Sequence, residues 1–251
     1  NKWRQTKFIE EYNKEYLNYY LETNKLDAKT KATLISKNYV YGYIENAPYE
    51  VKVNGKVAGI AGEYIDRVSR LANINFKYKK YSSVNALQKA VDKGEVDVYF
   101  EYYNISGKEY VPTISTFIED YVVIGKQKDN HVVTSFESLR NQEIAMIKDN
   151  SLYNYFKNNS RAKIKTYKDI DDLVKNAGTR LIVVDNEIYS RYQSSKFKKL
   201  NLIYRDTMMN DYKFMVKDKN AAFYDLFNYI INTNSYYNYR NSGIENMTAS
   251  S

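Results

Sequence analysis

The chain has 251 residues, a length that suits one large domain or two small lobes. Hydrophobic residues make up 43% and charged residues 27%, as in a folded protein rather than a disordered one. It has no Cys and a single His, His131. These counts exclude disulfide scaffolds, thiol nucleophiles, Cys-based zinc sites and two-His metal sites, and they leave His131, in a polar stretch, as the only residue for a His-based triad.

The formal net charge is +8, with 38 basic and 30 acidic residues spread along the chain. The densest basic runs are Lys77-Tyr-Lys79-Lys80 and Lys196-Phe-Lys198-Lys199. Neither has the length of a stripe that tracks a nucleic-acid backbone, so we expect no nucleic-acid partner. The charge instead indicates a solubilising positive surface or affinity for an anionic cell wall.

The first segment differs from the rest of the chain. Phe8, Tyr12 and Tyr16 recur at a spacing of four residues, which predicts a helix from about Trp3 to Leu21. A second short helix is expected up to about residue 36. Residues 1–37 are therefore predicted to form an N-terminal helical linker or extension. The chain begins with Asn rather than Met, so we expect an excised or processed segment.

Strands and helices are then predicted to alternate. The Asn54-Gly55 pair indicates a hairpin between 50–53 and 56–60, and Ser83 and Gly94 bound a helix. Alternation of this kind is typical of parallel α/β sheets. The other predicted strands are 39–44, 75–81, 97–103, 143–147, 163–167, 181–185 and 212–216, and the other helices are 63–72, 151–159, 169–177 and 221–233.

Several motifs occur in a recognisable order. Pro48-Tyr49 is followed by Asn54-Gly55-Lys-Val-Ala-Gly59, and then by Leu87 to Asp97 with Gly94 between them. Over 38–233 this order resembles the family 3 bacterial extracellular solute-binding proteins. Their later motifs are matched more loosely, by 139–147, by Asp149-Asn-Ser151 and by Leu181 to Asp185.

The resemblance implies the fold class: α/β, with the bilobed periplasmic-binding-protein-like type 2 or Venus flytrap fold. Two α/β sheets joined by hinge strands would follow the helical extension. Lobe 1 is expected at 38–121 plus 206–245, and lobe 2 at 122–205. The crossings are expected near Tyr121 to Gly125 and Leu202 to Arg205. A ligand would bind in the interlobe cleft, and the lobes would close on it.

The resemblance also implies a ligand site, with one departure from the family. Members that bind amino acids hold the α-carboxylate with an Arg, but here Glu109 aligns at that position, or Lys108 with a one-residue gap. Asp185 aligns with the acid that holds the ligand amine. The residues expected to contact a ligand are Glu45, Asn46, Tyr49, Tyr102, Tyr103, Asn104, Lys108, Asn150, Ser151 and Asp185.

Each of these residues also has a purely structural interpretation. Tyr49 would be a packed ring in a turn, and Tyr102 and Tyr103 would pack beneath the hinge. Asp185 would cap the following helix, as Asn150 and Ser151 would cap theirs. Lys108 would be a solvated loop charge. The sequence alone leaves these alternatives open.

The resemblance and the N-terminal extension together favour an extracellular ligand-binding sensor domain of a bacterial membrane signalling protein. Its partners would be a small polar ligand, amino-acid-like or a peptide, and adjoining flytrap or signalling domains of the same membrane-anchored protein at the cell surface. The alternative is the substrate-binding receptor of an ABC importer for amino acids or related polar solutes. An enzyme is disfavoured, because no nucleophile–base pair or metal cluster is present, so we expect no catalytic residue, no metal and no cofactor.

Overall fold

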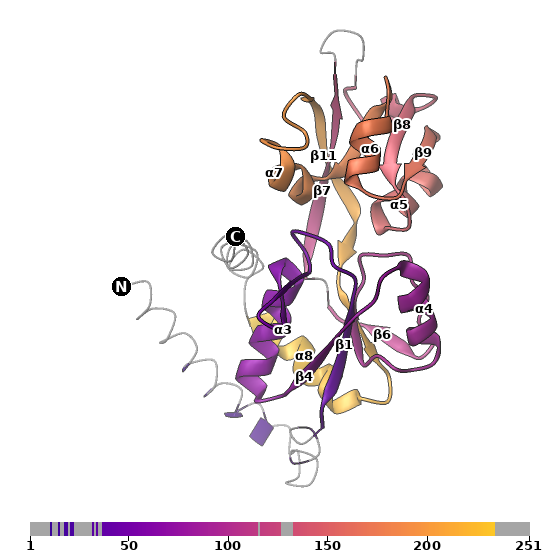
Figure 1. Ribbon diagram of the computed structural model, residues 1–251. Helices are drawn as coiled ribbons and strands as arrows, with labels where there is room; N and C mark the ends of the chain where they lie inside the picture. Colours follow the sequence, from indigo (N-terminus) through magenta and orange to yellow (C-terminus); the bar gives the residue numbers. More distant parts are fainter. Residues whose placement is uncertain are drawn as a thin grey trace. The chain divides into compact units, whose positions relative to one another are not determined.

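The computed structural model describes residues 37–114, 116–126 and 133–233, together with a few single positions between 11 and 34 (Figure 1). The predicted helical extension over 1–37 falls almost wholly outside the described residues, as does His131. Both expectations stay predictions. None of the helices in the described ranges combines the length and the hydrophobicity that a membrane-spanning segment needs.

The chain forms two compact units, each of which is built from separate stretches of sequence. Unit 1 draws its residues from Asn1–Phe100, Ser106–Ile114 and Phe214–Ser251, and unit 2 from Glu101–Ile105 and Ser115–Lys213. The short segment Glu101–Ile105 therefore groups with unit 2 although it directly follows a strand of unit 1. The lobe limits expected from the sequence stay a prediction.

Unit 1 contains a five-stranded sheet in the order β4-β1-β5-β12-β6. Strands β1 (Tyr39–Tyr43), β4 (Phe76–Lys80) and β5 (Val98–Phe100) are parallel, whereas β12 (Phe214–Lys217) is antiparallel to β5 and to β6 (Tyr110–Pro112). The sheet is thus mixed, and the prediction of a parallel sheet was wrong for β12. The chain reaches β12 directly from unit 2, with no crossover helix before it. Strand β12 therefore need not be parallel to β5 and β6.

The hairpin and helix α3 show how the first motifs fold. Strands β2 (Val51–Val53) and β3 (Lys56–Ala58) pair antiparallel around Asn54 and Gly55, whose φ angles are 50° and 76°, as the sequence predicts. Helix α3 (Gly59–Ala72) begins four residues earlier than predicted. The backbone explains this difference, because the N–H groups of Ile60 and Ala61 donate to the carbonyls of Pro48 and Tyr49, at 3.0 Å each. The preceding turn therefore caps the helix.

In the continuous described ranges, unit 1 also has the helices α4 (Val84–Asp92) and α8 (Ala221–Thr233). The Ser83 side chain accepts a hydrogen bond from the N–H of Ala86 at 3.1 Å, which confirms Ser83 as the cap of α4. Gly94, with φ of 68°, follows the end of the same helix as predicted.

Aromatic rings form the centre of unit 1. Phe214 is fully buried, and its ring lies 6.3 Å from that of Tyr41, 6.0 Å from Tyr64, 5.3 Å from Phe100 and 5.2 Å from Phe227. Tyrosine takes positions here that Phe or Leu occupies in other cores, since the ring supplies apolar area and the hydroxyl finds a polar partner.

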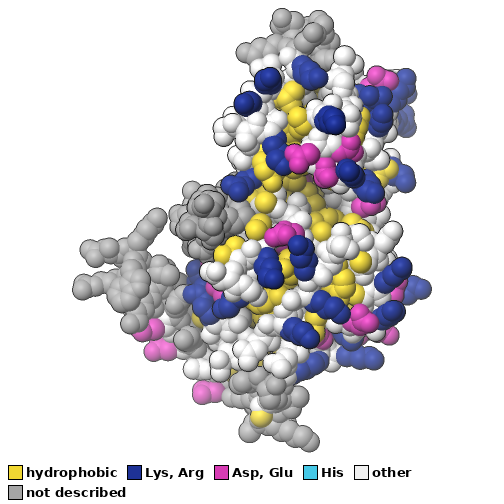
Figure 2. Space-filling view, in the orientation of Figure 1, with side chains coloured by type: hydrophobic (Ala, Val, Ile, Leu, Met, Phe, Trp, Pro, Cys, Tyr) yellow, Lys and Arg dark blue, Asp and Glu magenta, His cyan; other side chains and the backbone are white. Residues whose placement is uncertain are grey.

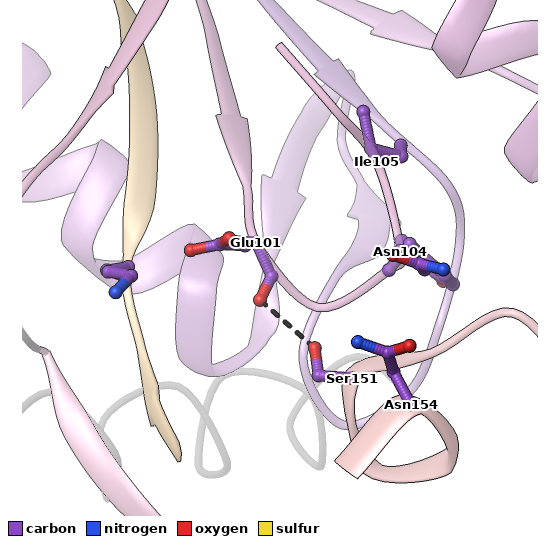
Figure 3. Close-up of a pocket in the computed structure, with 7 residues that line it drawn as sticks. Glu101, Asn104, Ile105, Ser151 and Asn154 are labelled. Carbon is purple, nitrogen blue, oxygen red and sulfur yellow. Dashed lines mark hydrogen bonds between the residues drawn. The ribbon is translucent and has the colours of Figure 1, made fainter. Parts of the chain in front are cut away.

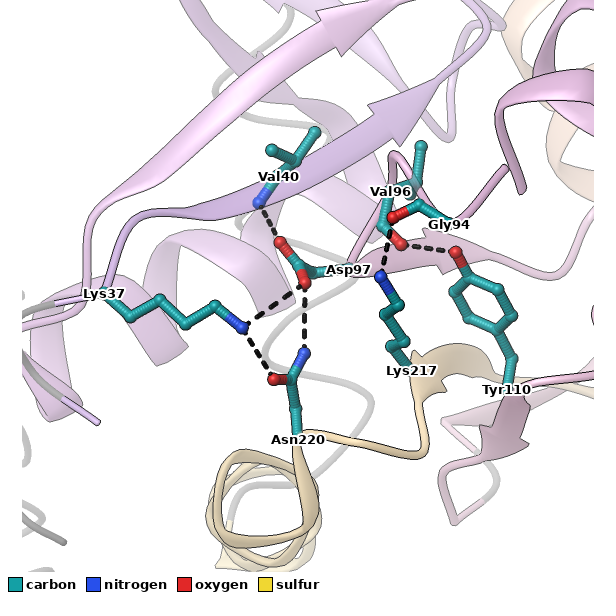
Figure 4. A network of polar contacts seen from close by, with 8 residues as sticks. All are labelled: Lys37, Val40, Gly94, Val96, Asp97, Tyr110, Lys217 and Asn220. Carbon is teal, nitrogen blue, oxygen red and sulfur yellow. Dashed lines mark hydrogen bonds and ion pairs between the residues drawn. The ribbon is translucent and has the colours of Figure 1, made fainter. Parts of the chain in front are cut away.

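Asp97 joins three segments of unit 1 (Figure 4). Its Oδ2 accepts a 2.8 Å hydrogen bond from the N–H of Val40, and its Oδ1 accepts one of 3.0 Å from Nδ2 of Asn220. Lys37 Nζ lies 3.8 Å from Oδ1 and donates to Asn220 at 2.8 Å. This carboxylate therefore ties β1 and the residue before α8 to the start of β5.

Unit 2 contains a second mixed sheet, in the order β11-β7-β10-β8-β9. Strand β10 (Leu181–Asp185) is parallel to β8 (Glu143–Ile147), which is parallel to β9 (Lys163–Tyr167). Strand β7 (Phe117–Gly125) is antiparallel to β10 and to β11 (Asn201–Tyr212). The helices are the 3-10 turn η1 (Glu137–Leu139), α5 (Ser151–Asn159), α6 (Ile170–Asn176) and α7 (Asn186–Tyr192).

The sequence predicts most of unit 2 correctly but misses its long antiparallel strands. The predicted ranges of β8, β9, β10 and α5 agree with the observed bounds. Strands β7 and β11 were expected only as short crossings, and α7 was expected only in the structural alternative in which Asp185 precedes a helix. Strand β11 includes Arg205, Asp206 and Asn210, so it lacks the apolar alternation that marks a strand in a sequence.

Candidate functional site

Asp185 lies at the end of β10 and is 1% exposed. Its Oδ1 accepts a 2.8 Å hydrogen bond from the hydroxyl of Tyr212, and its Oδ2 accepts a second from the hydroxyl of Tyr102. The side chain makes no capping bond to α7, although Asp185 precedes that helix. Burial raises the pKa of Asp185 to about 6, and the two hydroxyl donors oppose that rise.

The space beside Asp185 is small. A cavity of about 10 Å³ is lined there by Tyr102, Asn150, Asp185 and apolar neighbours. This volume is close to the minimum for one water molecule. Asp185 therefore acts in this arrangement as an internal anchor for two tyrosines, and its expected contact with a ligand amine stays a prediction.

The loop before α5 packs against the segment 102–104. Asn150 is buried, and its side chain accepts a 2.8 Å hydrogen bond from the N–H of Tyr153, so Asn150 caps α5. The N–H of Ser151 donates to the carbonyl of Tyr102 at 2.7 Å, and its hydroxyl donates to the same oxygen. The N–H of Asn104 donates to the carbonyl of Asp149 at 3.3 Å. Asn150 thus forms the helix cap that the structural alternative describes, and its contact with a ligand stays a prediction.

A polar cavity of about 190 Å³ opens next to these contacts (Figure 3). All of its lining residues belong to unit 2. Three of them, Tyr103, Asn104 and Ser151, are residues expected from the sequence to contact a ligand. The other four are Glu101, Ile105, Asn154 and Lys213.

Glu101 is the chemically unusual member of this lining. Its Oε2 is buried and has no hydrogen-bond partner among the described residues. Burial raises the pKa of the carboxyl, and the charge of Lys213 offsets part of that rise. The N–H of Glu101 donates to the carbonyl of Lys213 at 2.9 Å, which holds the two residues together. Buried carboxylate oxygens nearly always have a partner, so an unpartnered one in a cavity wall is a mark of a binding site.

Sequence reasoning missed Glu101 and Lys213. The signal was present, because Glu101 is an acid at the end of the apolar run Val98-Tyr-Phe. The predicted strand 97–103 hid it, since that strand placed Glu101 inside a sheet. The observed β5 ends at Phe100, and the chain then leaves the sheet.

The remaining expected residues belong to unit 1. Glu45 is exposed, forms a 2.9 Å ion pair with Lys80 and has a pKa lowered by that hydrogen bond. Tyr49 is fully buried, and its ring lies 6.0 Å from that of Phe100. The backbone of Asn46 pairs with Glu50, and Lys108 is exposed. These surroundings agree with the structural alternatives for Tyr49 and Lys108, and their ligand contacts stay predictions.

On the face that Figure 2 shows, Lys and Arg side chains are scattered with Asp and Glu among them, rather than gathered in one continuous stripe. In the part of the chain that the structure describes, no group of three His, Asp or Glu side chains gathers as metal ligands would.

No family model matches the sequence, and no curated protein matches it. Solved structures do match the fold. The Bordetella pertussis BvgS VFT2 domain, as a double mutant, has a TM-score of 0.70 at 13% identity, covering 88% of this chain and 97% of that one. The GluR0 ligand-binding core in complex with L-glutamate has a TM-score of 0.66 at 16% identity, covering 84% and 97%.

A third match is the substrate-binding protein of an amino acid ABC transporter, with a TM-score of 0.62 at 16% identity, covering 83% of this chain and 100% of that one. At these identities the likeness concerns the fold. The resemblance that the sequence motifs indicate is therefore confirmed at that level: this chain has the periplasmic-binding-protein type 2 fold that the family 3 solute-binding proteins share with flytrap sensor domains.

Proposed function

We propose that the chain is a binding module for a small polar solute, without catalytic activity, and that the ligand occupies the cavity lined by Glu101. The observation that carries this proposal is the buried, unpartnered carboxylate oxygen of Glu101 in a polar wall. The fold supports it, since the GluR0 core that shares this fold was solved with L-glutamate bound. The small volume, about 190 Å³, suits a small solute or one charged group of a larger one, such as a peptide.

The charges of the lining indicate the ligand's chemistry. The Glu101 carboxylate favours a ligand with an ammonium group, because a charge-assisted hydrogen bond would satisfy the buried oxygen. Lys213 lines the same cavity and favours an anionic group on the same ligand. Asn104, Ser151 and Asn154 supply neutral donors and acceptors. An amino-acid-like zwitterion has this combination of groups.

Calorimetry with a panel of ligands tests the proposal. The panel holds the common amino acids and, for each that binds, the analogue without the amine and the analogue without the carboxylate. Glu101→Gln should weaken binding of the amine-bearing ligand about tenfold or more, and it should not change binding of the analogue without the amine.

The matched control is Glu143→Gln, an exposed acid at the start of β8 in the same unit. It should bind like the wild type. The proposal fails if no compound in the panel binds or raises the melting temperature of the wild-type chain. It also fails in its assignment of Glu101 if Glu101→Gln and Glu143→Gln bind the amine-bearing ligand equally well.

The wider role that we propose is that of an extracellular sensor domain in a membrane signalling protein. The predicted helical linker over 1–37 supports it, and so does the likeness to the BvgS VFT2 domain. A structure of the B. pertussis BvgS periplasmic domain is matched over 45% of its length, with a TM-score of 0.68. That periplasmic domain offers a precedent for this fold as one part of a larger assembly.

The alternative role is the receptor of an ABC importer, which the likeness to an amino acid ABC transporter's binding protein supports. The sequence of the full gene product separates the two roles. The sensor role requires transmembrane and output segments in the same polypeptide. A lipid-anchoring Cys directly before Asn1, in a product that ends near Ser251, would instead establish the importer role.

A further inference from the structure

A second cavity of unit 2 combines an apolar floor with a basic rim. Its volume is about 210 Å³, and its floor is formed by Val174, Ala177, Ile182 and Leu200. Five cationic side chains line the same cavity, and no acidic side chain does. The five are Lys126, Arg180, Lys196, Lys198 and Lys199.

The strand register explains why these cations lie together. Ile182 of β10 pairs with Ile124 of β7, and Asn201 of β11 pairs with Gly125. Lys126, Arg180 and Leu200 lie just beyond these pairs. They are therefore brought together at one end of the three strands. Asp185 pairs with Tyr121 near the other end of the same strands. The basic cavity is thus separate from the Asp185 anchor.

Phe197 holds the Lys196–Lys199 turn in place. Its ring is 1% exposed and lies 6.4 Å from that of Tyr189 and 6.3 Å from that of Tyr192. Because the apolar residue of the run points inward, the three lysines around it are exposed. In the fold, this charged run therefore forms an exposed basic turn that is attached to unit 2 by the buried ring of Phe197.

Helix electrostatics account for only part of this arrangement. Cations near the carboxyl end of α6 stabilise its dipole, but Lys126 follows β7, and Lys198 and Lys199 come from the turn before β11. Lys196 forms a 2.9 Å ion pair with Asp171. Among the described residues, no ion pair is formed by the other four cations. Gathering four such charges costs free energy, which an anionic partner would offset.

We propose that this cavity docks an acidic peptide segment of a partner protein. One apolar side chain of the segment would enter the floor, and flanking Asp or Glu side chains would contact the basic rim. A volume of about 210 Å³ accommodates one apolar side chain, with the flanking residues of the segment outside the cavity. Buried apolar anchors surrounded by complementary charges are the usual source of affinity and specificity at such sites.

Fluorescence anisotropy tests the proposal on the whole chain. The probe is a fluorescein-labelled pentapeptide with a central leucine and two glutamates on each side. We expect saturable binding that weakens as salt is added. Replacing the central leucine by glycine should weaken binding about tenfold or more, because the buried apolar contact is lost. The double variant Lys198→Gln with Lys199→Gln should weaken it to a similar extent.

The matched control is Lys163→Gln with Lys165→Gln, which removes the same charge from β9 at the other edge of the sheet. It should leave binding of the peptide unchanged. Equal loss with both double variants, or equal binding of the leucine and glycine peptides, would show attraction by net charge alone and would overturn the proposal. A chain that does not bind the peptide but binds phosphatidylserine vesicles through Lys198 would also overturn the proposal. That result would identify a lipid surface as the occupant.

Discussion

The hydroxyl of Tyr212, the last residue of β11, donates a 2.8 Å hydrogen bond to the carboxylate of Asp185, the last residue of β10. Strand β7 separates β10 from β11 in the sheet, so no backbone ladder joins these two residues. Tyr102 donates to the other oxygen of the same carboxylate. Asp185 thus fixes the end of β11 and the segment Glu101–Ile105, two stretches of unit 2 that adjoin unit 1 in the sequence.

Removing the Asp185 carboxylate should destabilise the chain. Asp185→Ala leaves the buried hydroxyls of Tyr102 and Tyr212 without this acceptor, which should cost about 2–4 kcal/mol of unfolding free energy. Asp185→Asn keeps one acceptor oxygen and should cost less. Urea denaturation measures both variants. An alanine variant as stable as the wild type would refute the anchoring role of Asp185.

Stability should fall as the pH rises from 6 to 8. Glu50 is 1% exposed and accepts a 2.6 Å hydrogen bond from the hydroxyl of Tyr41, and burial raises its pKa to about 8. The folded chain keeps this proton to a higher pH than the unfolded chain, whose carboxyl has a pKa near 4.5. The contribution of Glu50 is therefore greatest below pH 4.5 and is lost as the pH approaches 8, by at most about 1.4 kcal/mol per pH unit.

Glu50→Gln is the variant that isolates this effect, because glutamine stays neutral and retains an acceptor for Tyr41. Its melting temperature should change less between pH 6 and 8 than that of the wild type. Asp185, with a pKa of about 6, acts in the same direction but mostly below this window. Glu45→Gln, on the exposed side of the same turn, should keep the wild-type pH dependence. A Glu50→Gln variant with an unchanged pH dependence would contradict the assignment.

The Asp97 carboxylate should be a main polar support of unit 1. Asp97→Ala removes its hydrogen bonds to Val40 and Asn220, and we expect a loss of about 2–4 kcal/mol. Asn220→Ala removes one of the same bonds, so the double variant should lose less than the sum of the two. The exposed Asp218→Ala is the control. Strict additivity in the double-mutant cycle would show that the two side chains act independently.

Two glycines with positive φ should respond differently to alanine. Gly59 has φ of +93°, and a Cβ there would lie 2.6 Å from the carbonyl oxygens of Pro48 and Tyr49, which cap α3. Gly55 has φ of +76°, but no atom lies within 4 Å of its Cβ position. We expect Gly55→Ala to cost about 1–2 kcal/mol and Gly59→Ala about 3 kcal/mol or more. Thermal unfolding of the two variants compares them, and equal losses would argue against the close approach at Gly59.

Local patterns in the sequence predicted the elements whose signals are local. Ser83 and Gly94 bound α4, Asn54-Gly55 forms the hairpin turn, and the apolar run Leu181 to Asp185 is a buried strand. The order of these motifs was also sufficient to indicate the fold. Each of these signals depends on backbone preferences or on the alternation of side chains over a few residues, which neighbouring residues in the chain can supply by themselves.

The candidate site was predictable only in part. The sequence indicated Tyr103, Asn104 and Ser151 by their alignment, and all three line the polar cavity. It gave no reason to choose Glu101 or Lys213, because both are ordinary charged residues in the sequence. Only in the fold does Glu101 follow the end of β5 and donate its N–H to the carbonyl of Lys213. The ligand contacts expected of Tyr49 and Asp185 stay predictions. In the fold, the ring of Tyr49 packs against Phe100, and Asp185 accepts hydrogen bonds from two tyrosine hydroxyls.

The sequence by itself determined the alternation of strands and helices, the likeness to flytrap binding proteins and the absence of thiol chemistry. Tertiary structure alone decided which charged groups are buried, which of them lack partners and which strands from distant parts of the chain meet. The reason is that burial and pairing depend on contacts between residues far apart in sequence. Glu101 and Lys213 become neighbours only where β5 and β12 pair, and Lys126 and Arg180 only after the sheet of unit 2 has formed.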